Sequence, residues 1–166
     1  MAATITGDQT GTVGLINAKT SVASTSGTSI DITGIPSGVK RITVMFSGVS
    51  GSGTANPLIQ LGTVSGVETT SYQASSSRVT SAVNSADFTA GFALNGSSAA
   101  NIYSGSLIFS NFSGNTWVAQ GVFTLTAGTV FSAGTKTLSG TLDRVRLTWS
   151  NGTDTFDAGS INILYE

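Results

Sequence analysis

The residues of this chain that could perform acid–base chemistry are its carboxylates: Asp8, Asp31, Glu68, Asp87, Asp143, Asp154, Asp157 and Glu166. A glycosidase needs two carboxylates about 5–10 Å apart across a cleft, and Asp154 with Asp157, joined by Glu68, could form such a set. The same segment, NGTDTFDAG, is also typical of a turn in which Asp accepts hydrogen bonds from backbone N–H groups. We interpret it as a turn, assign no catalytic residue and expect a protein that is not an enzyme.

Other familiar chemistry is excluded by composition, because the chain has no histidine and no cysteine. It therefore has no Ser–His–Asp triad, no thiolate nucleophile, no disulfide and no zinc knuckle. Calcium is the metal that Asp and Asn oxygens favour, but Asn151, Asp154 and Asp157 do not match the spacing of an EF-hand loop. The glycine-rich segment 48–53 fits neither nucleotide-binding pattern and is typical of a loop tip. We predict no cofactor and no metal.

The charge balance also excludes some partners. The formal net charge is -1 and charged residues make up 9% of the chain. A nucleic-acid-binding protein normally carries a basic stripe and a high pI, whereas the pI here is about 5.2. No apolar run approaches the ~20 residues that span a bilayer. We expect neither nucleic acid nor membrane as a partner. Weak self-repulsion favours close assembly with other subunits.

A period of two in hydrophobicity dominates the chain from residue 28 onward. In the segment 39–49, for example, Ile42, Val44 and Phe46 alternate with side chains such as Thr43. This alternation is typical of a half-buried strand. The strands predicted in this way cover residues 28–33, 39–49, 57–63, 67–73, 87–95, 101–112, 116–126, 129–138, 142–150 and 156–165. The fold class that follows is all-β, an antiparallel β-sandwich of about 8–10 strands resembling a jelly roll.

The connections between these strands are short and rich in turn residues. Asn95-Gly96 and Asn151-Gly152 favour type I′ hairpins, the second of which would join the last two strands. The segment 71–86 is either a long surface loop or a short helix, and we favour the loop. Residues 1–27 form an extended arm, an edge strand or a frayed terminus, and residues 28–166 form a single domain.

Alternation also assigns side chains to the interior. The predicted core contains Ile42, Val44, Phe46, Leu58, Phe92, Leu107, Phe109, Trp117, Phe123, Val145, Leu147, Trp149 and Ile161. Tyr72, Tyr103 and Trp117 are candidates for stacking on sugars if they are exposed, but core packing is the commoner role of such residues. Arg144 and Arg146 share one face of a strand, and the pair 40–41 begins another. If these strands are neighbours, their basic face would pair with acids such as Asp31 and Asp143 or stay solvated.

Three stretches resemble a family of small tailed-phage virion proteins and fibre-tip domains. They are SGTSIDITGIPSGVKRITVMFSGVSGSGTANPLIQLG (26–62), NTWVAQG (115–121) and GTKTLSGTLDRVRLTWSNGTDTFDAGSINILYE (134–166). The resemblance implies a bacteriophage structural protein on the outer surface of the virion, made in the host cytoplasm. The family has no catalytic motif to transfer to this chain.

The function we expect is therefore that of a homotrimeric capsid decoration (cement) protein that stabilises the outer shell. Its partners would be copies of itself and the major capsid protein or tail proteins. The alternative is a tail-fibre or receptor-binding tip that recognises a host glycan through the loops at 50–56 and 71–86. The subunit contacts are assigned to apolar residues that are hard to place in one core: Ile5, Val13, Leu15, Ile16, Met45, Phe131 and Leu164. The N-terminal arm would extend across a neighbour by strand addition.

Overall fold

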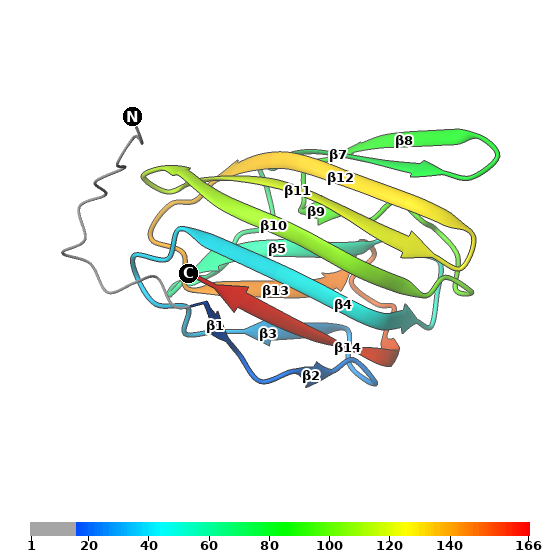
Figure 1. The fold of residues 1–166 in the computed structure, drawn as a ribbon, viewed down its shortest axis with the longest axis horizontal. Helices are drawn as coiled ribbons and strands as arrows, with labels where there is room; N and C mark the ends of the chain where they lie inside the picture. The colour runs from blue at the N-terminus through cyan, green and yellow to red at the C-terminus, as the bar shows by residue number, and fades with distance from the viewer. Residues whose placement is uncertain (1–15) are drawn as a thin grey trace, which may run out of the picture.

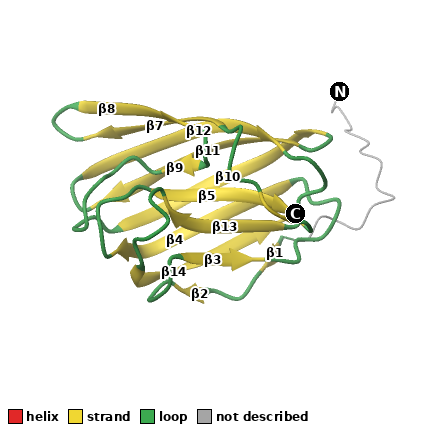
Figure 2. Cartoon of the chain, turned by 180° about the vertical axis from the view of Figure 1, so that it is seen from behind, coloured by secondary structure: helices red, strands yellow, loops and turns green. Residues whose placement is uncertain are grey.

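Two antiparallel β-sheets lie face to face in this computed structural model, which describes residues 16–166 (Figures 1 and 2). The larger sheet has nine strands in the order β1-β14-β4-β10-β11-β12-β7-β8, with β2 also paired to β14. The smaller sheet has five strands in the order β3-β13-β5-β6, with β9 also paired to β5. The predicted all-β antiparallel sandwich is confirmed. No helix of the described residues could cross a membrane.

The strands of the larger sheet are β1 (Asn17–Ala18), β2 (Val22–Ala23), β4 (Arg41–Gly51), β7 (Gln73–Val79), β8 (Val83–Phe88), β10 (Tyr103–Ser113), β11 (Thr116–Leu125), β12 (Gly128–Thr137) and β14 (Phe156–Tyr165). Those of the smaller sheet are β3 (Ser29–Ile32), β5 (Pro57–Thr63), β6 (Gly66–Val67), β9 (Phe92–Ala93) and β13 (Arg144–Trp149). The count exceeds the prediction because four of these strands have only two residues, too few to show a period in the sequence.

The core fills the space between the sheets, and every residue predicted for it is buried. Alternation places Ile42, Val44 and Phe46 of β4 on the inner side, where the Phe46 ring meets the Phe123 ring edge to face at 5.3 Å between centroids. Trp117 is 3% exposed, so its ring offers no surface to a sugar. Tyr72 and Tyr103 are each 1% exposed and are likewise unavailable for stacking.

The prediction of a loop at 71–86 is wrong, because most of this segment belongs to the hairpin of β7 and β8. The inward side chains of β7 are Ala74 and Ser76, which are small. They therefore leave no hydrophobic alternation for a sequence reading to detect. β7 forms because it pairs with β12 on one side and β8 on the other, and this pairing depends on residues far away in sequence.

The two Asn-Gly pairs do not form the predicted type I′ hairpins. Asn95 and Gly96 are buried, and the Asn95 side-chain amide donates to the backbone and side-chain oxygens of Asn84. Gly152 does turn the chain, with φ +69° and its N–H donating to the Trp149 carbonyl at 2.9 Å. The turn, however, joins β13 in the smaller sheet to β14 in the larger one. The last two strands therefore lie in different sheets.

Two predicted strands are shorter than expected because the chain changes sheet within them. In 67–73 only the first residue is in β6 and only the last is in β7. In 87–95 the chain leaves β8 of the larger sheet and enters β9 of the smaller sheet. Of the N-terminal segment, β1 and β2 form short edge strands on β14. Residues 1–15 lie outside the described residues.

The variant Tyr72→Phe tests the hydrogen bonds that connect Tyr72 to the backbone of Leu61 and Glu68. The Tyr72 hydroxyl donates to the Glu68 carbonyl and accepts from the Leu61 N–H, each at 2.8 Å, and burial raises its pKa. Tyr72→Phe leaves the Leu61 N–H buried without this partner and is expected to cost about 1–3 kcal/mol of unfolding free energy. The measurement is urea unfolding. Tyr165→Phe is the matched control, because the Tyr165 hydroxyl has no hydrogen bond within residues 16–166. Equal losses for both variants would contradict the prediction.

Candidate subunit-contact face

The solvent side of the nine-stranded sheet, here called the outer face, has at its centre two rows of side chains that cross six strands. Antiparallel register sets these rows, because residues directly opposite each other share a face. The first row, from β14 to β7, is Asn162, Met45, Ser106, Val122, Phe131 and Ser77. The second row, in the same direction, is Leu164, Thr43, Ile108, Gln120, Ala133 and Ser75. No residue of either row is charged.

Large apolar side chains of the outer face remain open to solvent. Val122 is 49% exposed and Phe131, its direct partner in the first row, is 48% exposed. Val118, two residues before Gln120 on β11, is 39% exposed. Single exposed apolar residues are common on soluble proteins, but Val122 and Phe131 are direct neighbours and form an apolar patch. An aromatic and a β-branched side chain exposed side by side are suited to the core of a contact with another protein.

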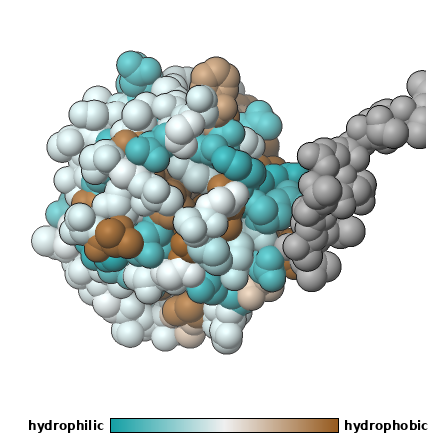
Figure 3. Space-filling view, turned by 90° about the vertical axis from the view of Figure 1, so that its left-hand side faces the viewer, coloured by the Kyte–Doolittle hydropathy of each residue, from teal (hydrophilic) through white to brown (hydrophobic). Residues whose placement is uncertain are grey.

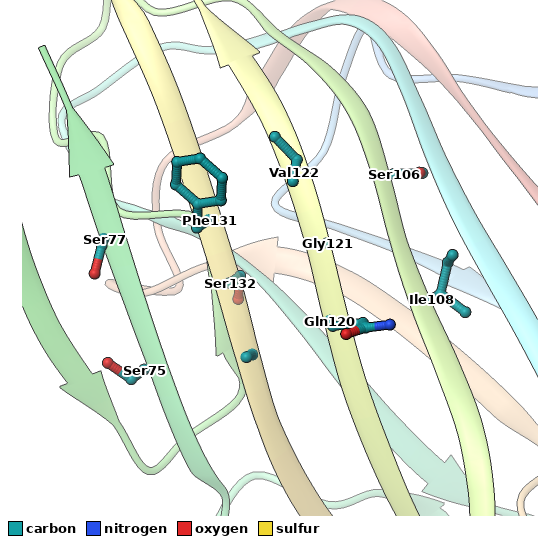
Figure 4. A pocket seen from close by; sticks show the side chains of 10 residues that line it. Ser75, Ser77, Ser106, Ile108, Gln120, Gly121, Val122, Phe131 and Ser132 are labelled. Atoms are coloured by element: carbon teal, nitrogen blue, oxygen red, sulfur yellow. The ribbon is translucent and has the colours of Figure 1, made fainter.

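A shallow hollow of about 580 Å³ lies over this patch (Figure 4). Figure 4 shows Val122 and Phe131 side by side above it, with Ile108 and Gln120 on the strands toward β4. Ser75 and Ser77 of β7 close the opposite side. Because the serines and Ala133 are small, another protein surface could approach the backbone of the sheet closely here. By contrast, one end of the sandwich shows hydrophobic side chains in small separate groups among hydrophilic and weakly polar ones (Figure 3).

Charged groups lie at the borders of the outer face, outside the part of each row that crosses the six strands. Arg41 pairs with Glu166 at 3.2 Å where β4 begins and β14 ends, beside Leu164 and Thr43. Asp87 continues the second row onto β8, at the sheet edge. An apolar centre with a polar rim is the usual anatomy of a protein–protein contact.

The predicted contact residues are placed as follows. Met45 and Leu164 are half-buried members of the outer face, and Phe131 is among its most exposed members. Ile16 is 65% exposed and lies with Leu164 at one end of the second row. Ile5, Val13 and Leu15 lie outside the described residues. Sequence reasoning missed Ile108, Val118 and Val122, although their spacing on one side of β10 and β11 follows a period of two.

The candidate carboxylates each serve a local structural role. Asp154 accepts from the Ala55 N–H at 2.9 Å and from the Asn151 amide at 2.7 Å. The hydrogen bonds from Asn151 and Ala55 lower the pKa of Asp154. Asp157 accepts a hydrogen bond from the Ser50 hydroxyl, and Glu68 forms a salt bridge with Lys136. Within residues 16–166 no three acidic side chains are grouped to hold a metal ion.

The basic residues of β4 and β13 lie in different sheets, so the expected shared basic face does not form. The predicted acid partners on β13 do occur. Arg146 donates to both Asp31 oxygens at 2.7 and 2.6 Å, and these hydrogen bonds lower the pKa of Asp31 despite the opposing effect of burial. Arg144 pairs with Asp143 at 3.1 Å.

A buried ion pair that the sequence did not indicate lies beside the smaller sheet. Lys136 is 4% exposed, and its Nζ lies 2.7 Å from a Glu68 carboxylate oxygen. The same Nζ donates to the Thr70 carbonyl at 3.0 Å and lies 5.1 Å from the centre of the Tyr72 ring. The other Glu68 oxygen accepts from the Ser139 N–H and hydroxyl, both at 2.7 Å. This cluster ties β12 to the segment between β6 and β7.

A comparison with protein-family models, curated proteins and solved structures finds no match for this chain. The function of the outer face is therefore inferred from the exposure, charge and register of its side chains.

Proposed function

We propose that this chain is a non-enzymatic structural protein of a bacteriophage particle, a homotrimeric decoration (cement) protein that stabilises the outer shell of the capsid. The observation that carries the proposal is the uncharged centre of the outer face, where Val122 and Phe131 are exposed side by side. The phage assignment rests on the sequence resemblance described above.

The energetics of the outer face favour association. Full burial of a Val or Phe side chain contributes about 1.5–3 kcal/mol, so a few such residues per subunit provide several kcal/mol. The rows contain no charge whose desolvation would oppose contact, and a net charge of -1 causes little repulsion between copies. Side chains of serine, threonine and alanine keep the remaining surface flat enough for close packing.

The cement role is tested by counting copies per particle. Virions of the phage that encodes the chain are purified, and the chain is quantified against the major capsid protein by mass spectrometry. A decoration protein is expected in hundreds of copies, in a fixed ratio to the capsid protein. A handful of copies would overturn the cement role and place the chain in the tail. Absence from the virion would overturn both placements.

A receptor-binding tip is the second candidate, and a groove on the smaller sheet favours it. The groove has a volume of about 420 Å³ and is lined in part by Gln60, Arg146 and Asn151. Asp31, Arg146 and Gln60 lie in one register row across β3, β13 and β5. Gln60 is 5% exposed and its amide donates to the Ala90 carbonyl at 2.8 Å, so it offers little to a ligand. The partly exposed guanidinium of Arg146 and the amide of Asn151 are the groups of this groove that suit the hydroxyl groups of a sugar. Binding on a glycan array, lost in Arg146→Ala, would support this role, and a blank array would contradict it.

A further inference from the structure

The strand β8 is an uncovered edge of the larger sheet. Among the described residues its only strand partner is β7, whereas the opposite border strand β14 is covered by β1 and β2. The β7–β8 hairpin projects at one side of the sandwich (Figure 1). Its sequence, VNSADF, has one charge and neither proline nor lysine, which are the residues that commonly block an exposed edge. β8 is thus suited to pairing with another strand.

The hydrogen-bond pattern shows which backbone groups of β8 are available. The Thr80 N–H donates to the Ala82 carbonyl at 3.0 Å, and β7 and β8 continue in the same register. In an antiparallel pair, residues alternate in directing their N–H and C=O groups toward the partner strand. Ala86 therefore faces β7, and Ser85 directs its backbone groups away from the sheet. An added strand would bind these outward groups.

The N-terminal segment already behaves as an added strand in this fold. Asn17 and Ala18 pair with Tyr165 and Leu164 of β14, and β2 continues the contact along the same strand. In the segment before them, Val13 and Leu15 are separated by one small residue, which is typical of a strand. Asp8 is the only charged side chain among residues 1–15, so this segment matches the low charge of β8.

The length of residues 1–15 sets how far this segment can extend from Ile16. Fifteen extended residues span up to about 50 Å, whereas Val13 lies within about 10 Å of Ile16 along an extended chain, so contact of Val13 with β8 requires that the neighbour's β8 lie beside the β14 edge. The described chain begins at Ile16, on the β14 side, and β8 is the last strand on the opposite side. In a closed ring, each copy can give one segment to a neighbour and receive one from the other neighbour. Pairing with β8 of the same copy would require the segment to cross its own outer face, which the proposed trimer uses.

We propose that residues in the 1–15 segment of one copy add as a strand to β8 of a neighbouring copy. This inference rests on the proposed trimer and names the segment and the edge that link its subunits. The absence of natural cysteine allows a clean cross-linking test in the full chain.

The test uses single-cysteine variants and a short bismaleimide cross-linker. Val13→Cys chains are mixed with Val83→Cys chains, dissociated and reassembled. Val83 lies on β8 and is 67% exposed. The expected product is a dimer that contains one chain of each kind and is lost when Ser85→Pro is added, because proline removes the outward N–H. Ser85→Ala, which keeps that N–H, retains the dimer. Val64→Cys is the control, since Val64 is 77% exposed on the turn after β5 and should not cross-link to Val13→Cys.

Each other result has a distinct meaning. A trimer without the mixed dimer overturns strand exchange and leaves the proposed trimer standing. Cross-links between two Val83→Cys chains show β8 pairing with itself, which also overturns the exchange. A monomer at all concentrations overturns both the exchange and the trimer.

Discussion

Replacing Phe131 with glutamate is expected to convert the assembled protein into monomers at concentrations where the wild-type chain is fully associated. Phe131 is 48% exposed and lies between Val122 and Ser77 in a row that contains no cation. A carboxylate buried there at a contact would lose hydration without gaining a partner, at a cost of several kcal/mol. Each 1.4 kcal/mol weakens an equilibrium by about tenfold. Sedimentation equilibrium measures the change.

Two further variants separate a contact effect from a folding effect. Phe131→Leu keeps an apolar side chain and should remain associated. Val64→Glu adds the same charge at a position that is 77% exposed on the turn after β5, and it should also remain associated. The thermal stability of the Phe131→Glu monomer should stay within about 1 kcal/mol of the wild-type subunit, because the side chain is already half exposed. A Phe131→Glu protein with the wild-type mass would show that the outer face is not the contact.

Replacing Glu68 with glutamine is expected to cost about 3 kcal/mol of unfolding free energy, at the low end of the range for breaking a buried ion pair. The change leaves the Lys136 ammonium, 4% exposed, without its counter-ion. The loss is at the low end because the Thr70 carbonyl and the Tyr72 ring still contact this ammonium. Denaturant unfolding at neutral pH measures it.

The matched variant Lys136→Met removes the buried charge together with the need for its partner. It should cost about 1 kcal/mol or less, since Glu68 keeps its two hydrogen bonds from Ser139 and part of its solvent contact. A loss from Lys136→Met as large as that from Glu68→Gln would contradict this account of the cluster.

The same pair predicts how stability depends on pH. Burial acts to raise the pKa of Glu68, but the hydrogen bonds from Lys136 and Ser139 outweigh it and hold the pKa below the ordinary value of 4.5. The stabilisation from a carboxylate with a lowered folded pKa is complete above its unfolded pKa and is lost as pH falls through the folded one. Stability should therefore decline below about pH 4.5, and the decline should be shallower in Glu68→Gln.

Local patterns in the sequence predicted the fold class and the core but not the strand partners. Alternation at Ile42, Val44 and Phe46 identified the inner side of β4 correctly, because strand geometry fixes that side within one segment. The assignment of β13 and β14 to different sheets depends on pairing with β5 and β4, which lie far away in sequence. Turn residues alone therefore suggested a hairpin that does not form.

The outer face was partly predictable, because alternation within a strand separates its two sides. Met45, Phe131 and Leu164 stood out because each is apolar in the outward register of its strand. Val118 and Val122 did not, because both sides of β11 carry apolar residues and the sequence does not say which side faces the core. The pair of Glu68 and Lys136 joins residues far apart in sequence through a contact that no local pattern indicates.

The mass of the wild-type chain in solution tests most directly whether the outer face joins copies of this protein. Light scattering on a size-exclusion column, at micromolar concentration and above, reports this mass independently of molecular shape. The account predicts about 50 kDa, three times the 16.7 kDa of one chain. A mass of 16.7 kDa at every concentration would contradict it.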